Sequence, residues 1–450
     1  MANSYLIKPD FQKTYAEITH GKGVFLYDVD GKAYLDASSG AVTASLGHGV
    51  TAIRKAIHEQ LKKVSFVYRS QFTTAAAERL AATINEKMPT NTPYYSFFVN
   101  SGSEATETAM KIAIQYWQDR NQPTKTFILS RWFSYHGITM GALSMSGHLK
   151  RRERFSSLLE KYPQVEAPYC YRCPYQLSYP TCQLKCAQEL ETVIQRVGAK
   201  QIAAFIVEPV VGAAGCAITP PRGYYEKIKE LCEKYEILLI ADEVMTGAYR
   251  TGPFLALEHW GVEADIVTLG KGLAAGYATI AAAVISEEIY QTIGHHSKII
   301  MSGHTHSANP LACATALAVL QYGQEENFSE KVKRKGHYLK RQLQHLAERH
   351  SFIGEIRGVG LLLGVELVQD RKSKSMFPRH ILLLEKLITI AEEHGLLLYP
   401  GSCGNGLEGD GFLIAPPFTI TYAEMHVLTA KLQSTFTELE RVLKEEGIYE

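Results

Sequence analysis

The sequence lacks an excess of basic charge, a membrane-spanning apolar run and a signal peptide. Its 450 residues carry 47 Lys plus Arg against 46 Asp plus Glu, so the net charge is +1 and basic charge is not in excess. Binders of nucleic acids or anionic membranes usually concentrate such an excess on one face, so both classes are excluded. No apolar run approaches the roughly 20 residues of a membrane-spanning helix. Residues 1–10 also lack the charged start and apolar core of a signal peptide, so we expect a cytoplasmic protein.

Internal repeats, low-complexity tracts and long linkers are also missing. With 46% hydrophobic and 21% charged residues, the composition is that of a globular protein with a large core. At roughly 150 residues per domain, the length suggests about three domains, or one large α/β core with smaller additions.

The middle of the chain alternates short apolar segments with amphipathic ones. Such nearly continuous apolar segments, separated by helical patterns, predict strands of a mostly parallel sheet that is buried on both faces by helices. The predicted strands are residues 95–99, 126–129, 203–207, 237–241, 266–269 and 280–285.

The two ends of the chain have a different pattern. Residues 24–37 place Asp30-Gly31 between two apolar runs, which predicts a tight β-hairpin. After residue 323, strand-like segments alternate with amphipathic helices, and the last helix opens with the capping box Thr421-x-x-Glu424. We therefore predict an α/β fold in which a mostly parallel, seven-stranded-type sheet with helices on both faces spans residues 61–323. Residues 1–60 and 324–450 together are expected to form a smaller α+β domain.

A first chemical signal is the run S-G-S-E-A at residues 101–105, between a predicted strand and a predicted helix. A small-residue turn at that point directs backbone N–H groups and the positive end of the helix dipole at one place, which suits a phosphate. Ser101 and Glu104 also match a capping box, so a well-capped helix without a ligand explains the same residues.

Two further signals end predicted strands. Asp242-Glu243 follows residues 237–241, and Lys271 stands between two glycines after residues 266–269. Ligands of open parallel sheets bind at the carboxyl ends of the strands, although an acid pair there could also cap a helix or bind a metal. A lysine at the edge of the core is usually a solvated side chain, but lysine is also the residue that forms Schiff bases with carbonyl compounds.

Taken together, the three signals give a phosphate cradle, a carboxylate and a lysine at one edge of the sheet, and pyridoxal 5'-phosphate (PLP) needs all three. At this point the sequence resembles the class III (ω-amino acid type) aminotransferases of PLP fold type I. The resemblance extends from L-D-A-S-S-G at residues 35–40 and G-H-G at 47–49 to A-P-P-F at 415–418. It implies a PLP-dependent aminotransferase that works as a homodimer.

The resemblance also implies roles for single residues. Lys271 would form the Schiff base with the cofactor and move protons, and Asp242 would hold the ring nitrogen; these two are the predicted catalytic residues. Gly102 and Ser103 would bind the phosphate, and Tyr135 would stack on the ring.

Three more residues complete the predicted cofactor site. Glu208, in V-E-P, matches a family acid near the ring, and Val244 belongs to the same set. Thr305 would reach the phosphate of the neighbouring subunit. His136, beside Tyr135, is interpreted as a structural histidine or as a further contact of the cofactor, and no metal is assigned to the catalytic site.

The sequence departs from relatives that use glutamate and 2-oxoglutarate. Those relatives carry an arginine, a glutamate and a glutamine where this chain has Leu413, Ala213 and Met245. Losing the arginine together with its glutamate is coherent, because losing one alone would leave a buried charge unpaired. A tryptophan pair of diaminopelargonate synthases corresponds to Ala41 and Val42. We therefore expect a roomy site for an amine or a ω- or β-amino acid, with pyruvate or another small 2-oxo acid as partner.

The partner of a substrate carboxylate is left open at this stage. Arg69 and Arg250 are candidates, and either could instead belong to a structural ion pair. The run K-R-R-E-R at residues 150–154 is interpreted as a solvated helix face or as a contact for an anionic substrate. Fold and cofactor do not fix which bond breaks, so an aminomutase, racemase or decarboxylase is the alternative reaction. A non-catalytic, cofactor- or zinc-binding protein is a further alternative, although the site residues are all present.

Four of the eight cysteines, Cys170, Cys173, Cys182 and Cys186, crowd into one stretch. Their spacing is that of a four-cysteine zinc site, in a segment whose prolines and tyrosines indicate an irregular loop. Disulfides are disfavoured in the cytoplasm. Structural zinc and free thiols packed in apolar surroundings therefore remain as the two interpretations.

Overall fold

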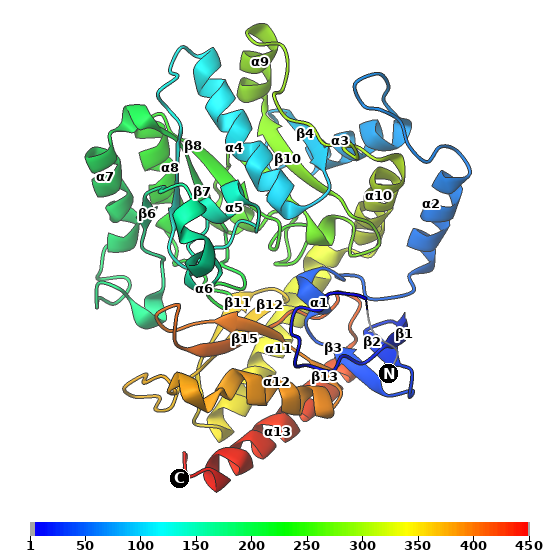
Figure 1. Ribbon diagram of the computed structural model, residues 1–450, viewed down its shortest axis with the longest axis vertical. Coiled ribbons are helices and arrows are strands. Elements are labelled where there is room, and N and C mark those ends of the chain that lie inside the picture. Colours follow the sequence, from blue (N-terminus) through cyan, green and yellow to red (C-terminus); the bar gives the residue numbers. More distant parts are fainter. Residues whose placement is uncertain (1–4, 449–450) are drawn as a thin grey trace.

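A computed structural model describes residues 5–448 of the chain. The outermost residues of the two predicted terminal segments, 1–4 and 449–450, lie outside this range. Figure 1 shows two parts: a large sheet surrounded by helices, and below it two small sheets with their own helices. Within the described residues, none of the helices is long and apolar enough to cross a membrane.

The large sheet has seven strands in the order β4-β10-β9-β8-β7-β5-β6. The pairings from β9 to β6 are all parallel, and β10 is antiparallel to both of its neighbours, β9 and β4. The predicted mostly parallel sheet is thus confirmed, and the two-residue edge strand β6 was not predicted. The strands are β4 (Tyr94–Val99), β5 (Phe127–Arg131), β6 (Gln164–Val165), β7 (Ile202–Val207), β8 (Leu238–Asp242), β9 (Ile266–Leu269) and β10 (Ala281–Ser286).

Helices cover both faces of this sheet, as its apolar strands require. Ile206 and Ile240 pack with Ile112 of α4 on one face, whereas their strand neighbours Phe205 and Leu239 pack on the other face with α8. The helices of this part are α2 (Thr51–Leu61), α3 (Ala75–Glu86), α4 (Gly102–Asp119), α5 (Met140–Ser144), α6 (Leu149–Arg152), α7 (Lys185–Val197), α8 (Tyr224–Lys234), α9 (Glu287–His295) and α10 (Pro310–Glu325).

The smaller part combines both ends of the chain. In its first sheet, β13 (Leu396–Leu397) pairs in parallel with β3 (Ala33–Asp36), so the C-terminal segment completes a sheet that the N-terminal hairpin begins. The second sheet has the order β11-β12-β15-β14. The remaining elements are β1 (Ile18–Lys22), β2 (Phe25–Asp28), α1 (Ser39–Val42), β11 (Ile353–Val359), β12 (Leu362–Leu367), β14 (Tyr399–Ser402), β15 (Asp410–Ile414), α11 (Phe328–Arg349), α12 (Leu383–Glu393) and α13 (Tyr422–Glu445).

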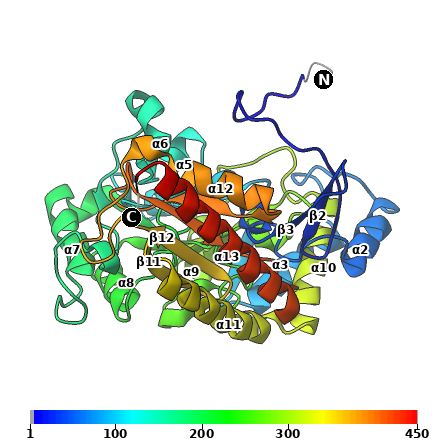
Figure 2. The ribbon, with the colours of Figure 1, turned by 90° about the horizontal axis from the view of Figure 1, so that it is seen from below.

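Seen from below, α11, α12 and α13 cover these small sheets (Figure 2). The hairpin at Asp30-Gly31 is confirmed, with Gly31 at φ 80°, a conformation that favours glycine. The capping box that opens α13 is also confirmed, because Thr421 and Glu424 each bond the backbone N–H of the other. The domain boundaries at residues 60 and 323 stay a prediction.

Three of the four clustered cysteines, Cys170, Cys173 and Cys182, lie in the connection between β6 and α7, which is mostly irregular as expected, whereas Cys186 lies in the first turn of α7. All eight cysteines are free thiols, and the part of the chain that the structure describes holds no group of three or more His, Cys, Asp or Glu arranged for a metal ion. The loop is instead fixed to the smaller part by polar contacts. Arg172 forms an ion pair of 2.5 Å with Glu366 of β12, and Lys374 donates to the carbonyl of Tyr171 at 2.6 Å. The arrangement gives the zinc interpretation no support.

Candidate active site

A cavity of about 190 Å³ lies at the carboxyl ends of the central strands. We call it the inner cavity. It brings together seven of the eight residues that the sequence assigned to the cofactor; Thr305 is the exception. Its lining consists of Gly102, Ser103, Tyr135, His136, Gly137, Glu208, Ala213, Asp242, Val244, Met245 and Lys271.

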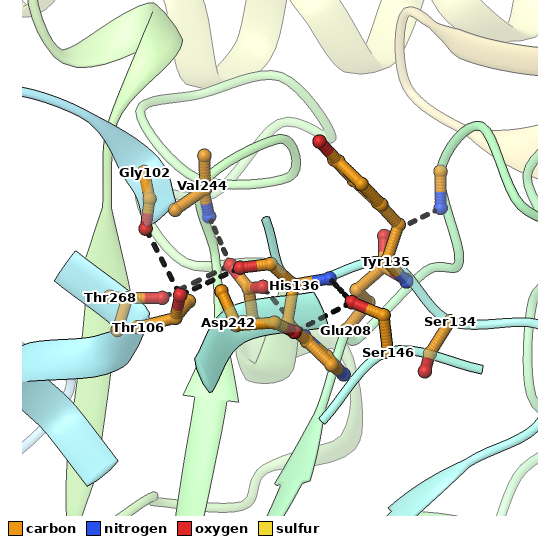
Figure 3. A network of polar contacts seen from close by, with 12 residues as sticks. Gly102, Thr106, Ser134, Tyr135, His136, Ser146, Glu208, Asp242, Val244 and Thr268 are labelled. Atoms are coloured by element: carbon orange, nitrogen blue, oxygen red, sulfur yellow. Dashed lines mark hydrogen bonds and ion pairs between the residues drawn. The ribbon is translucent and has the colours of Figure 1, made fainter. Parts of the chain in front are cut away.

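Asp242, the last residue of β8, is buried and fully engaged by polar neighbours (Figure 3). Its Oδ2 lies 2.7 Å from Nδ1 of His136, and its Oδ1 accepts hydrogen bonds from Thr268 Oγ1 (3.0 Å) and the N–H of Val244 (3.1 Å). Such bonds stabilise the ionised carboxylate. Nε2 of His136 is buried and lacks a hydrogen-bond partner among the described residues. The arrangement presents a fixed negative charge at the floor of the cavity.

Thr268 was not singled out in the sequence, although a signal was available. It lies directly opposite Asp242 in the parallel pairing of β8 with β9. Two polar residues near the carboxyl ends of adjacent buried strands are expected to meet, so knowledge of the strand order would have identified Thr268.

Glu208 connects the acidic side of the site to the loop that carries Tyr135. Its carboxylate accepts hydrogen bonds from the N–H groups of Tyr135 (2.9 Å) and Gly212 (2.9 Å). Burial raises the pKa of Glu208, nearby Asp242 raises it further, and His136 and the two N–H groups oppose this. The side chain therefore fixes the position of the Tyr135 backbone.

Lys271 follows β9 and points into the same cavity as Asp242 and Glu208. Burial, the largest cause, lowers the pKa of its amine, whereas the two carboxylates raise it. Lys271 has φ 38°, a strained conformation for a side chain other than glycine, and such strain gathers at functional sites. The geometry thus gives a partly desolvated amine beside two acids.

The other end of the cavity is the N-terminus of α4. Half of the expected capping box forms: Ser101 caps the helix by accepting from the N–H of Glu104 (3.2 Å), whereas the Glu104 carboxylate accepts from the N–H of Asn100 (2.8 Å) and not from that of Ser101. Within residues 5–448 the N–H groups of Gly102 and Ser103 have no acceptor, so they are available to an anion. A Cβ at Gly102 would lie 2.7 Å from Cγ1 of Val244, so this close approach requires glycine.

The three positions at which this chain differs from the glutamate-using relatives have apolar side chains, and these side chains lie in apolar surroundings. Leu413 is buried with Val42 and Met245, and Met245 and Ala213 line the inner cavity. The guanidinium of Arg357 lies close to Leu413, because Arg357 is opposite Gly364 in the sheet and Gly364 is opposite Leu413. Arg357 does not line the inner cavity, and it is already engaged by Glu366 (2.7 Å) and the carbonyl of Gly215 (2.7 Å).

The two arginines proposed as carboxylate partners lie elsewhere. Arg250 is buried and donates to the carbonyls of Leu361 (3.0 Å) and Pro416 (2.8 Å). Arg69 donates to the carbonyl of Ser302 (3.0 Å). Neither lines the inner cavity, so the structure does not support the hypothesis that either one binds the substrate.

Comparison with known proteins identifies the family. The model of the family "Aminotransferase class-III" matches residues 7–436. YodT, an uncharacterized aminotransferase of Bacillus subtilis, is 50% identical over 445 residues, which cover 99% of this chain and 100% of the relative. A putrescine–pyruvate aminotransferase of Pseudomonas aeruginosa is 33% identical, and the match covers 91% of this chain and 88% of that relative. A taurine–pyruvate aminotransferase of Bilophila wadsworthia is 34% identical, with 94% and 92% covered.

Solved structures agree with these relatives. An (S)-enantioselective ω-transaminase from Thermomicrobium roseum superposes with a TM-score of 0.90 at 36% identity, covering 97% of this chain and 96% of that one. An amine transaminase of an uncultivated Pseudomonas species, in its PLP-bound form, gives a TM-score of 0.91 at 32% identity, covering 97% and 99%. The fold, the geometry of the site and these comparisons lead to one conclusion: the chain belongs to the class III aminotransferases.

Proposed function

We propose that this aminotransferase moves an amino group from an amine or a ω- or β-amino acid to a small 2-oxo acid such as pyruvate, with PLP held in the inner cavity. The observation that carries the proposal is the meeting of Lys271, Asp242 and the free N–H groups of α4 around one cavity. The apolar surroundings of Leu413 support the choice of oxo acid, because the guanidinium nearest to them in the sheet, Arg357, is already paired with Glu366 and is not free for the second carboxylate of 2-oxoglutarate. Two of the relatives named above use pyruvate.

The residues of the cavity fit PLP in chemistry and position. The N–H groups of Gly102 and Ser103 would hold the phosphate, and Asp242 would hold the ring nitrogen in its protonated form. Tyr135 and Val244 would contact the ring, and Lys271 would form the covalent link. When bound, PLP supplies an electron-accepting ring to the carbon that bears the amine.

The chain's own residues account for the proton transfers of the reaction. When its amine is free, Lys271 is a base whose burial favours the neutral form that accepts a proton. General acid–base transfer of this kind contributes about two to four orders of magnitude in rate. His136 and Thr268 hold the carboxylate of Asp242 in place, so its charge is fixed before the substrate arrives.

We also propose a homodimer in which Thr305 reaches the phosphate site of the neighbouring subunit. Thr305 is exposed and does not line its own cavity, and its loop lies against α4, where Ser302 contacts Thr108 at 3.3 Å. The cytoplasmic location belongs to the same proposal, supported by eight free thiols, which are typical of a reducing compartment.

A donor and acceptor panel tests the proposed reaction. Purified holoenzyme is incubated with amines and with α-, β- and ω-amino acids, each against pyruvate and 2-oxoglutarate, and the new amino acid is measured. We expect pyruvate to be the better acceptor by a factor of about 10 or more, since 2-oxoglutarate would bury an unpaired carboxylate. Activity with 2-oxoglutarate alone would contradict the choice of acceptor. Turnover without any oxo acid would indicate an aminomutase, racemase or decarboxylase instead.

A further inference from the structure

Arg151, in α6, lies over the ring of Tyr135 at the edge of the inner cavity. Its guanidinium carbon is 4.6 Å from the centre of that ring, and its Nη1 is 3.5 Å from the phenol oxygen. The side chain is exposed and forms no ion pair within residues 5–448. A cation in this position is held by an aromatic face and keeps most of its hydrogen-bond donors free.

The other guanidinium groups near the site are already engaged. Arg131 is buried and donates to the carbonyl of Glu208, and Arg152 donates to the carbonyls of Leu143 and Ser146 at 2.9 and 2.6 Å. Arg250, as described above, is bound to carbonyl groups of the smaller part. If any of these arginines turned to a substrate, the buried carbonyl groups that it now bonds would lose their partner. Arg151 can bind a substrate without that cost.

Arg151 itself lines neither the inner cavity nor a second, outer cavity. This outer cavity, of about 280 Å³, is lined by residues that include Trp132, Phe133, His148 and Leu149. The ring of His148 contacts that of Tyr135 edge-on at 6.2 Å, so a residue of the inner cavity touches a residue of the outer one. The charge of Arg151 nevertheless acts on Lys271, whose pKa it lowers, so the guanidinium lies within electrostatic range of the reacting amine.

We propose that Arg151 binds the carboxylate of the amino donor, and that this carboxylate is separated from the amine-bearing carbon by at least one further carbon. The proposal rests on the proposed transamination and names its substrate class. The carboxylate of an α-amino acid sits on the reacting carbon and would therefore lie inside the inner cavity, which Arg151 does not line. A β- or ω-amino acid places its carboxylate further out, past Tyr135, where the guanidinium is free to form a two-pronged bond.

The test compares two donors that differ at one end only. 3-Aminobutanoate and 2-aminobutane differ in whether a carboxylate or a methyl group ends the chain, and the half-reaction of each with holoenzyme is followed by the visible absorbance. We expect Arg151→Gln to lower kcat/KM for 3-aminobutanoate about 100-fold and to change that for 2-aminobutane less than about 3-fold, since only the former loses a charge-assisted bond. Arg151→Lys should restore part of the loss. The control Lys150→Gln removes a neighbouring exposed charge and should leave both donors nearly unchanged. Equal losses for both donors, or no loss for either, would overturn the proposal.

A binding measurement separates this proposal from the proposed function. Butanoate, which has the carboxylate but no amine, is titrated into wild-type, Arg151→Gln and Lys150→Gln holoenzyme by calorimetry. We expect binding to weaken at least about 10-fold in Arg151→Gln only. If no donor is turned over but butanoate binding still depends on Arg151, the reaction is wrong and the carboxylate site stands. If 3-aminobutanoate is turned over and butanoate binds equally to all three proteins, the carboxylate site is wrong and the reaction stands.

Discussion

Nδ1 of His136 lies 2.7 Å from Oδ2 of Asp242, and both side chains are almost fully buried. This contact fixes the orientation of the Asp242 carboxylate in the cavity. We expect Asp242→Asn to lower kcat by about 100- to 1,000-fold, as for loss of a preorganised charge, while the cofactor still binds through Lys271. Stopped-flow absorbance with the best donor measures the rate. His136→Asn should give a smaller loss, and an unchanged rate in Asp242→Asn would contradict the role of the carboxylate.

The assignment of Lys271 predicts where the cofactor is covalently held. After reduction with borohydride, wild-type protein should carry the cofactor permanently on a peptide that contains Lys271, because lysine forms the reducible imine. Lys271→Ala should carry none, and its donor half-reaction should disappear. Mass spectrometry of the digested protein provides the measurement, with the exposed Lys298→Ala as control. Label that persists at another lysine in Lys271→Ala would refute the assignment.

Gly102 and Val244 are predicted to be coupled. A Cβ at position 102 would lie 2.7 Å from Cγ1 of Val244, so Gly102→Ala should force the turn away from the phosphate and weaken PLP binding about 10- to 100-fold. The double variant with Val244→Ala should recover part of that affinity, because it removes the atom that clashes. The affinity for PLP is measured by fluorescence titration of the four apoproteins: wild type, the two single variants and the double variant. Together they form a double-mutant cycle. Strictly additive losses would show that the clash is not the cause.

Glu243 gives a prediction for stability against pH. Burial raises the pKa of its carboxyl group from 4.5 to about 7, although hydrogen bonds from Thr246 and the N–H of Leu257 oppose this. Between these values the folded protein binds a proton that the unfolded chain has released, so the free energy of unfolding falls as the pH rises. Glu243→Gln cannot ionise, so its stability relative to wild type should rise by roughly 1 to 3 kcal/mol from pH 4.5 to 7.5. Urea unfolding at several pH values measures it, and exposed Glu153→Gln should show no such trend.

Thr305 tests the dimer. If it reaches the phosphate site of the neighbouring subunit, Thr305→Ala should weaken PLP binding by about 10-fold, the effect of one lost bond to a charged group. The neighbouring exposed side chain of His306 serves as a control through His306→Ala. Sedimentation should find a dimer for all three proteins. A monomeric wild-type holoenzyme would rule out the shared site.

Prediction from the sequence succeeded where a pattern is local. The runs at residues 203–207 and 237–241 are continuous and apolar. Short runs of this kind are typical of strands that a parallel sheet buries on both faces. The caps at Ser101 and Thr421 were predictable because each needs only residues within one turn. Strand β6 was missed because two residues carry no periodicity.

What the sequence by itself determined is the set of chemical groups and the edge of the sheet at which they gather. Asp242 ends one apolar strand and Lys271 closely follows the next, so parallel pairing of the two strands brings them to one edge. Only the tertiary structure decided which other groups complete the site. The contacts of Asp242 with Thr268 and His136 depend on strand register and on the path of a loop, and Arg151 meets Tyr135 because α6 folds back over it. Contacts of this kind result from packing between segments that share no periodic pattern, and for that reason no spacing along the chain records them.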